Sequence, residues 1–259
     1  MAYETILTAK HGATHVVTFN RPHQRNAVNH QMMREVTAAL LEAEADADSR
    51  CVIITGGSEF FSAGRDLKES SRSSPDEREE AKVALRRMTD TIENLKRPVV
   101  AAIEGHCLTG GLELALTCDL RVAGEGATFG ITSARLGTIP GFGGTQRLPR
   151  IIGMARALEM LFSAEPVDVE EACRIGLINR KADKGRALAE ALRMVEVYAD
   201  RAPLSLATLK QVVRQGMDLQ FTASLDLEQK LGATLTGTAD RAEGMAAFLE
   251  KRKPRFQGR

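Results

Sequence analysis

Two glycine-containing segments of the chain could place unpaired backbone amides next to each other. They are FSAGRDLKE, from Phe61 to Glu69, and AAIEGHCLTGGLELALTCD, from Ala101 to Asp119. Each pattern predicts a strand, a sharp turn and the start of a helix, and the first amides of a helix have no partner within it. These amides also lie at the positive end of the helix dipole. Two such turns that face each other would form an oxyanion hole, a pair of N–H groups that stabilises negative charge on an acyl oxygen.

The candidate donors of this hole are the amides of Arg65 and Gly110. Glycine at position 110 suits the role, because a side chain there would block the close approach of an acyl oxygen. A glycine turn before a helix more often serves only to connect two elements, so neither segment is specific by itself.

Glu113 is the candidate acid/base, in the first turn of the second predicted helix. A glutamate at such a position is stabilised by the helix dipole and often does nothing else. Here, however, its neighbours are Leu112, Leu114, Ala115 and Leu116, which make the run too apolar for a solvated face. We therefore expect Glu113 to be buried, with a pKa raised by the loss of solvent toward values that suit proton transfer.

Four other polar residues near these turns are assigned structural roles. His106 and Cys107 suggest a base and a nucleophile, but adjacent residues on a strand point to opposite faces, so we expect both to pack rather than to pair. Asp119 ends the helical run and should be structural. Asp66 should enter the helix after the first turn as its N-cap.

Alternating strand and helix patterns must position the two turns, which implies an α/β core. Apolar residues at helical spacing from Met33 to Ala43 predict one helix, and Ser74 and Pro75 open a second, charged helix that Pro98 stops. Short β-branched runs predict buried strands at His15–Phe19, Cys51–Thr55 and Val99–Ile103.

After about residue 145 we expect no further strands, and helical patterns dominate. Asp168 and Asp240, each followed by a glutamate three residues later, predict helix starts. The C-terminal leucines carry more apolar surface than a lone appendage could hide. We therefore expect a core over residues 1–195 and a helical region over residues 196–259 that packs on another subunit. Its helices, with the one before it, are expected at roughly 184–200, 203–216 and 218–250.

The composition limits the classes of partner. Thirty-five Lys and Arg against 34 Asp and Glu leave a net charge of +1, so no global field recruits nucleic acid or an anionic membrane. Four cysteines without a CxxC pair argue against a structural zinc site and a disulfide scaffold. No run approaches the ~18 apolar residues of a membrane span, and the N-terminus has no signal-peptide core. We expect a cytoplasmic protein.

A third segment, TFGITSARLGTIPGFGGTQRLPRIIG from Thr128 to Gly153, makes a family resemblance recognisable. The chain resembles the enoyl-CoA hydratase/isomerase (crotonase) family nearly from end to end. NRPHQRNAVN resembles the opening motif of that family, and FSAGRDLKE resembles its first oxyanion turn. GLELALTCDLRVA resembles its catalytic helix, and EGMAAFLEKRKPRF its C-terminal signature.

The resemblance implies an α/β fold, a crotonase-like spiral of ββα units with a helical C-terminal trimerisation region, assembled as a homotrimer or homohexamer. It implies an acyl-CoA substrate, as in fatty acid metabolism, and no metal or redox cofactor, since coenzyme A is part of the substrate. The thioester oxygen gains negative charge when Cα is deprotonated or when water adds at Cβ, and two preorganised N–H donors stabilise that charge.

The resemblance also marks departures at the site. Glu113 matches one of the two glutamates of the hydratases, but the place of the second falls on Ser133. A serine hydroxyl can orient a water molecule, but it cannot exchange a proton near neutral pH. Thr109 stands where many relatives have glycine. Relatives that isomerise dienes place a carboxylate just after the IP turn, where Pro140–Phe142 supplies none.

Coenzyme A would meet Lys68 near its adenosine end and Lys251 from a neighbouring subunit, although a run of charges is often only a solvated face. The remaining residues expected to line the substrate or coenzyme are Ala63, Asp66, Leu67 and Gly111.

Several activities share such a hole. Hydration of an enoyl-CoA is the leading one, followed by double-bond isomerisation and by thioester hydrolysis or decarboxylation. A different class is a weakly active acyl-CoA-binding protein, which the loss of the second glutamate favours and the presence of Glu113 opposes. Because one carboxylate has to do all proton transfer, we expect slow hydration of simple enoyl-CoAs. That leaves isomerisation or a specialised hydration.

Overall fold

A computed structural model describes residues 3–259 of the chain. Its strands form two sheets, a large one in the order β1-β2-β3-β5-β7-β10 and a small one in the order β4-β6-β8-β9. The large sheet is parallel except for the β1–β2 pair, and the small sheet is parallel except for the β8–β9 pair. The strands are β1 (Ile6–His11), β2 (Thr14–Phe19), β3 (Cys51–Thr55), β4 (Phe60–Ser62), β5 (Val99–Ile103), β6 (His106–Leu108), β7 (Leu120–Gly124), β8 (Thr128–Gly130), β9 (Val167–Asp168) and β10 (Arg180–Ala182).

The chain passes repeatedly from the large sheet to the small one. β3, β5 and β7 lie in the large sheet, and the strand after each of them, β4, β6 or β8, joins the small sheet before a helix follows. Each turn of the chain is thus a ββα unit, and the predicted spiral of such units is confirmed. The helices are η1 (Pro22–Gln24), α1 (His30–Ala45), α2 (Leu67–Arg72), α3 (Pro75–Asn94), α4 (Gly110–Thr117), η2 (Ser133–Leu136), α5 (Gly144–Ile152), α6 (Met154–Ser163), α7 (Val169–Arg174), α8 (Ala187–Ala199), α9 (Pro203–Gly216), α10 (Phe221–Ala233) and α11 (Ala239–Leu249).

The three predicted core strands are confirmed as β2, β3 and β5, and every residue of β3 and β5 is buried. The predicted helices before and after β3 are confirmed as α1 and α3. Ser74 and Glu77 form a reciprocal capping box at the start of α3, so the polar N-terminus of this helix has its first amides satisfied.

Three expectations for the second half of the chain are wrong. Strands do not cease near residue 145, since the short edge strands β9 and β10 follow. The sequence did not indicate them because their few, largely exposed residues carry no apolar pattern. The helix expected over 218–250 is two helices, α10 and α11, which a turn around Gly237 separates. Asp168 caps α7 as predicted, but Thr238 caps α11, while Asp240 accepts hydrogen bonds from the C-terminal tail.

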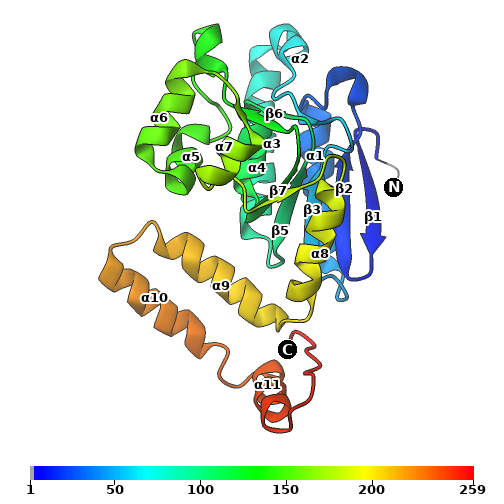
Figure 1. Ribbon diagram of the computed structural model, residues 1–259, viewed down its shortest axis with the longest axis vertical. Helices are drawn as coiled ribbons and strands as arrows, with labels where there is room; N and C mark the ends of the chain where they lie inside the picture. Colours follow the sequence, from blue (N-terminus) through cyan, green and yellow to red (C-terminus); the bar gives the residue numbers. More distant parts are fainter. Residues whose placement is uncertain (1–2) are drawn as a thin grey trace.

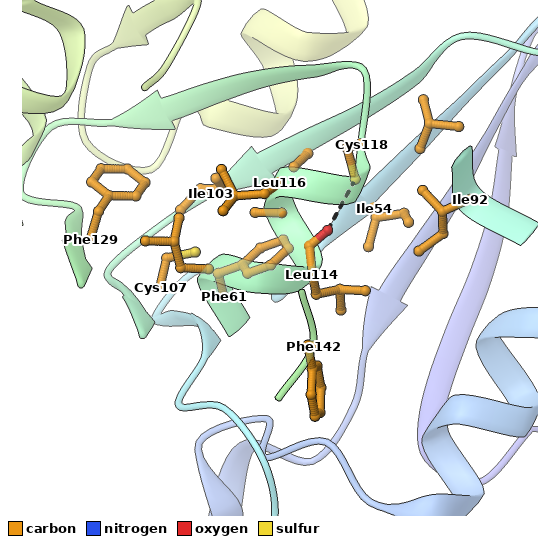
Figure 2. Packing of buried hydrophobic residues seen from close by; sticks show 14 of the residues in the cluster. Ile54, Phe61, Ile92, Ile103, Cys107, Leu114, Leu116, Cys118, Phe129 and Phe142 are labelled. Atoms are coloured by element: carbon orange, nitrogen blue, oxygen red, sulfur yellow. Dashed lines mark hydrogen bonds between the residues drawn. The ribbon is translucent and has the colours of Figure 1, made fainter. Parts of the chain in front are cut away.

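The helix α4 lies inside the protein between the sheets and its neighbouring helices. All eight of its residues are buried. Figure 2 shows Leu114 and Leu116 of this helix among apolar side chains from other elements, including Phe61 and Ile103. Because no residue of α4 is exposed, the helix has no solvated side for Glu113, and its position dictates the burial of that carboxylate.

The C-terminal helices α9, α10 and α11 extend away from the two sheets, whereas α8 lies along the large sheet (Figure 1). Lys210 and Arg214 of α9 reach the core through ion pairs of 2.8 and 2.9 Å with Asp119. No residue of α10 is buried, and Phe221 and Leu225 are exposed on it. The division at residue 195 stays a prediction. In the part of the chain from residue 3 onward, no helix has the length and apolar character needed to cross a bilayer.

Candidate active site

Three neighbouring strands of the small sheet end at the same edge. β4, β6 and β8 are parallel neighbours in that order, so the segments that leave their carboxyl ends lie side by side. These segments carry Arg65 after β4, Gly110 after β6 and Ser133 after β8. The topology therefore brings together the two predicted oxyanion turns and the position of the missing glutamate, at the kind of edge where open α/β sheets bind ligands.

The two oxyanion turns are in close contact through glycine. A Cβ atom added to Gly110 would lie 3.1 Å from the amide nitrogen of Arg65, and one added to Gly64 would lie 3.0 Å from the amide nitrogen of Gly110. Gly64 also has φ +103°, a conformation that other residues rarely adopt. Side chains at either position would separate the two turns, so glycine is required for the two amides to approach each other.

Both candidate donor amides are free to bind a ligand. The amide of Val28 donates to the carbonyl of Gly64 at 2.8 Å, and the amide of Asp66 donates to the carbonyl of Val28 at 2.9 Å. Since both neighbours of Arg65 pair with Val28, the amide of Arg65 points away from that pairing. Within residues 3–259, neither the Arg65 amide nor the Gly110 amide donates a hydrogen bond. The turns thus present the pair of donors that an oxyanion hole needs.

Thr109, immediately before Gly110, adopts a strained conformation with φ 49° and ψ −117°. A β-branched residue seldom occupies positive φ, and such strain is maintained only where surrounding contacts enforce it. The Thr109 amide donates to the carbonyl of Gly130 at 2.7 Å, and the Thr109 hydroxyl lies 2.9 Å from the Thr132 hydroxyl. These bonds tie the start of α4 to the segment that leads to Ser133.

Glu113 lies one helical turn after Gly110, on the same face of α4. Its side chain is buried, and Oε1 accepts hydrogen bonds from the amides of Phe142 at 2.7 Å and Gly144 at 2.8 Å. Burial raises the pKa of Glu113, while the two amides and the positive charge of Arg147 act in the opposite direction. The predicted burial and the predicted direction of the pKa are both confirmed.

The other buried carboxylates among the described residues serve the fold. Each of them either receives hydrogen bonds at a helix end or chain end, or pairs with a cation, whereas Glu113 lies one helical turn after the free amide of Gly110. These residues are Glu35, which binds the Glu4 and Thr5 amides, Asp66, which caps α2 and pairs with Arg21, Glu104, which binds the start of α8, and Asp240, which binds the tail.

The loop that contacts Glu113 was not identified from the sequence. Phe142 supplies an amide to the carboxylate, and its ring would touch a Cβ atom on Gly110 at 3.1 Å. A Cβ atom on Gly144 would lie 2.9 Å from Cγ of Glu113. The GFGG run was a visible signal, because clustered glycines indicate close backbone approach. Nothing in the run indicated which side chain it approaches.

Ser133 lies at the same edge but carries no proton-exchanging group. Its side chain is buried at the start of η2, and among residues 3–259 its hydroxyl makes no hydrogen bond. The hydroxyl is therefore free for a ligand or a water molecule. The site holds a buried carboxylate on the α4 side and a hydroxyl on the η2 side.

Comparisons with known proteins identify the family. The family model for enoyl-CoA hydratase/isomerase matches residues 9–259. A probable enoyl-CoA hydratase of Bacillus subtilis is 39% identical over 246 residues, which cover 94% of this chain and 95% of that protein. The short-chain-enoyl-CoA hydratase of Clostridium acetobutylicum is 35% identical over 254 residues, covering 98% and 97%. This chain belongs to the enoyl-CoA hydratase/isomerase family.

A solved structure of this family agrees with the fold. The enoyl-CoA hydratase of Bacillus anthracis superposes with a TM-score of 0.94 at 33% identity, covering 99% of this chain and all of that one. The predicted family and fold are confirmed, and the expectation of an enoyl-CoA hydratase or a related isomerase is confirmed at the level of the family.

Several of the residues expected at the substrate have clear structural contacts. Asp66 is the N-cap of α2, accepting the Glu69 amide at 3.1 Å, and pairs with Arg21 at 2.9 Å. A Cβ atom on Gly111 would lie 2.8 Å from Cβ of Ser62, so glycine there lets α4 pack on β4. These contacts explain both residues without a ligand, and their contact with coenzyme A stays a prediction.

The residues expected at coenzyme A lie at two separate places in one chain. Ala63 is half-buried beside the first turn, and Leu67 and Lys68 are exposed on α2. Lys251 follows α11, at the end of the protein opposite α2 (Figure 1). One chain therefore does not bring Lys68 and Lys251 together, and a contribution of Lys251 would have to come from a neighbouring subunit.

Cys107 and Asp119 have the structural roles expected beside the site, whereas His106, which was expected to pack, is exposed. Cys107 is fully buried, while His106 faces the opposite side, contacts the Phe60 ring and hydrogen-bonds the Thr128 hydroxyl at 2.7 Å. Asp119 accepts the Val99 amide at 2.8 Å and pairs with α9. All four cysteines are free thiols. Within residues 3–259, no group of three His, Cys, Asp or Glu side chains could hold a metal ion.

Proposed function

We propose that this protein transfers protons at Cα of an acyl-CoA thioester, with Glu113 as the acid/base and the amides of Arg65 and Gly110 as the oxyanion hole. The observation that carries the proposal is the position of Glu113, a buried carboxylate one helical turn from a free amide. A buried carboxylate with a raised pKa exchanges protons closer to neutral pH than an exposed one.

In the proposed isomerisation, the Glu113 carboxylate removes a proton from Cα of a 3-enoyl-CoA. The electron pair of that C–H bond moves toward the thioester, and the resulting negative charge on the thioester oxygen is held by the Arg65 and Gly110 amides. Protonated Glu113 then returns the proton to Cγ, and the double bond moves to the 2,3 position. One carboxylate suffices, because each proton that it takes is given back.

Hydration asks more of the site. Water that adds at Cβ must lose a proton while Cα gains one, and two carboxylates divide these tasks more readily than one. Ser133 can orient a water molecule but cannot act as the second acid. We therefore propose isomerisation, or hydration of a specialised substrate, as the preferred activity, with hydration of simple enoyl-CoAs slow.

The proposed ligand is the coenzyme A thioester alone, without a metal or redox cofactor. Lys68 is the proposed contact near the adenosine end, and Ala63, Leu67 and Gly111 are further proposed contacts of the substrate or coenzyme. A panel of acyl-CoAs, monitored by mass spectrometry for conversion and by melting temperature for binding, tests the proposal. Conversion of at least one enoyl-CoA, unaffected by EDTA, is expected. Activity that EDTA abolishes and zinc or magnesium restores would contradict it.

We further propose a homotrimer or a hexamer of two trimers, in which the exposed apolar residues of α9 and α10 are covered. Val213 and Phe221 are among these residues, and apolar patches of this kind favour association. Light scattering in dilute buffer tests the assembly. A clean monomer of 28.1 kDa would contradict both the assembly and the contribution of Lys251 from a neighbour.

A further inference from the structure

The loop of residues 141–144, whose amides bind Glu113, is rich in glycine and has little conformational rigidity of its own. Gly141, Gly143 and Gly144 surround Phe142, and Gly143 has φ +90°. Glycine adds conformational freedom to a loop. Yet the amides of Phe142 and Gly144 must stay within hydrogen-bond distance of Glu113. Something outside the loop has to fix it.

Arg147, one turn into α5, makes that contact. Its Nη1 donates to the carbonyl of Phe142 at 2.6 Å, on the peptide group next to the one whose amide binds Glu113. A Cβ atom on Gly143 would collide with the same guanidinium nitrogen. Glycine at 143 therefore makes room for Arg147 to lie across the loop, and the guanidinium determines the orientation of the Phe142 backbone.

Glu93, near the end of α3, holds Arg147 in turn. The two carboxylate oxygens of Glu93 accept from Nε and Nη2 of Arg147 at 2.7 and 2.8 Å, a bidentate pair. Both side chains are about four-fifths buried. A bidentate arginine–carboxylate pair fixes the plane of the guanidinium, which a single point charge such as lysine would not do.

Arg214 of α9 extends the same network to the far end of α4. It donates to the carbonyl of Thr117 at 2.8 Å and pairs with Asp119 at 2.9 Å and with Glu93 at 3.2 Å. The helix that carries Glu113 and the loop that binds Glu113 are thus both tied to Glu93.

We propose that Arg147 and Glu93 are positioning residues for Glu113, which hold the Phe142 and Gly144 amides on its carboxylate and so set its orientation and its protonation. The proposal rests on the proposed function for its kinetic consequences only. Arg147 is the charged group that acts on Glu113 from the neighbouring elements, with Glu93 and Arg214 behind it. Neither Arg147 nor Glu93 needs to touch the substrate.

The kinetic test uses Arg147→Gln in the full-length protein, with Arg150→Gln as the matched control. Arg150 lies one turn further along α5, is exposed and pairs only weakly, at 3.4 Å, with Asp218. We expect kcat of Arg147→Gln to fall by roughly ten- to a hundredfold, because small misplacements of a catalytic group carry losses of that order. The KM of Arg147→Gln should hardly change, and neither should the kcat of Arg150→Gln. Unchanged kcat in Arg147→Gln would overturn the proposal.

Glu93→Gln separates positioning from simple electrostatics. Removal of a nearby negative charge would by itself lower the pKa of Glu113. If Glu93 instead acts by holding Arg147 on the loop, its loss frees the two amides, and the pKa of Glu113 should rise. The acid limb of the pH–rate profile should therefore move to higher pH in both Glu93→Gln and Arg147→Gln. A limb that stays in place or moves to lower pH in Glu93→Gln would contradict positioning.

A titration that needs no turnover distinguishes failure of this proposal from failure of the proposed function. ¹³C NMR of protein labelled at glutamate Cδ, with the Glu113 signal assigned by its loss in Glu113→Gln, follows the carboxylate directly. We expect the midpoint of Glu113 to rise in Glu93→Gln and Arg147→Gln but not in Arg150→Gln. If no acyl-CoA is converted, the proposed function fails, and this titration still decides the positioning.

Discussion

The segments that follow β6 and β8 differ in chemistry although the sheet places them side by side. After β6, the helix α4 presents Glu113, a buried carboxylate that two backbone amides orient. After β8, the helix η2 presents Ser133, a hydroxyl without a partner among the described residues. The same strand–turn–helix framework thus positions a proton-exchanging group on one side of the site and only a hydrogen-bonding group on the other.

This difference separates what the fold supplies from what the side chains supply. The free amides of Arg65 and Gly110 come from the backbone and persist whatever acid stands at position 113 or 133. In the proposed mechanism, stabilisation of the enolate therefore depends on the backbone, and the number of proton-transfer steps depends on two side chains. Changing one side chain at a time tests this division.

The largest effect should come from removing the carboxylate. Glu113→Gln keeps an oxygen that can accept from the Phe142 and Gly144 amides, so the fold and the affinity for acyl-CoA should persist. The amide cannot exchange protons, and the loss of such catalysis typically lowers kcat by about 10²- to 10⁴-fold. Steady-state kinetics and calorimetric binding measure the two parts. A fully active variant would refute the role of Glu113.

A smaller loss of kcat should follow when a side chain blocks the oxyanion hole. In Gly110→Ala the new methyl group would lie 3.1 Å from the Arg65 amide, where the thioester oxygen should bind. Loss of one oxyanion donor lowers kcat by about 10²- to 10³-fold. Gly232→Ala in α10 is the control, because a Cβ atom there meets no atom within 4 Å. Equal activity of the two variants would show that the hole lies elsewhere.

A gain should follow from giving the second side its missing acid. Ser133→Glu places a carboxylate on the η2 side and should raise hydration of crotonyl-CoA by roughly tenfold, less than the full effect of a preorganised acid. Ser133→Gln has nearly the same size and cannot exchange protons, so it should give no gain. If the two variants behave alike in a hydration assay, position 133 does not face the reacting carbons.

The smallest expected effect is on stability. Burial raises the pKa of Glu113 above its ordinary value of 4.5, so the folded protein binds this proton more tightly than the unfolded chain. The free energy of unfolding therefore decreases as the pH rises from that ordinary value through the raised pKa. Glu113→Gln lacks this decrease, and its stability relative to wild type should improve from pH 4 to pH 8. Parallel urea titrations at several pH values measure the difference, and a constant difference would contradict the raised pKa.

The sequence predicted the parts of the site that depend on local pattern. The strands β3 and β5 are apolar runs, and the turn glycines and the apolar surroundings of Glu113 are visible within a few residues. The edge strand β10 was missed because three largely exposed residues carry no alternation. The ion pair between Glu93 and Arg147 joins residues 54 positions apart. No local pattern predicts a polar pair that only the folded chain brings together.

The strained backbone at Thr109 is a second feature that depends on contacts between distant parts of the chain. The family resemblance marked Thr109 as a departure from glycine. The hydrogen bond between its hydroxyl and that of Thr132, however, joins the segment after β6 to the segment after β8. Only the alignment of β6 with β8 makes that pair. Residue type can be read from a sequence, whereas the contacts that hold an unfavourable backbone conformation cannot.

The most direct test of the single-carboxylate site compares two reactions of the wild-type protein. Isomerisation of a 3-enoyl-CoA and hydration of crotonyl-CoA are measured under one set of conditions, with Glu113→Gln as the blank for both. We predict that kcat/KM for isomerisation exceeds that for hydration by roughly a hundredfold or more, because only hydration needs the second acid that the site lacks. Hydration of crotonyl-CoA with kcat/KM near the diffusional limit of about 10⁸ M⁻¹ s⁻¹ would contradict this account.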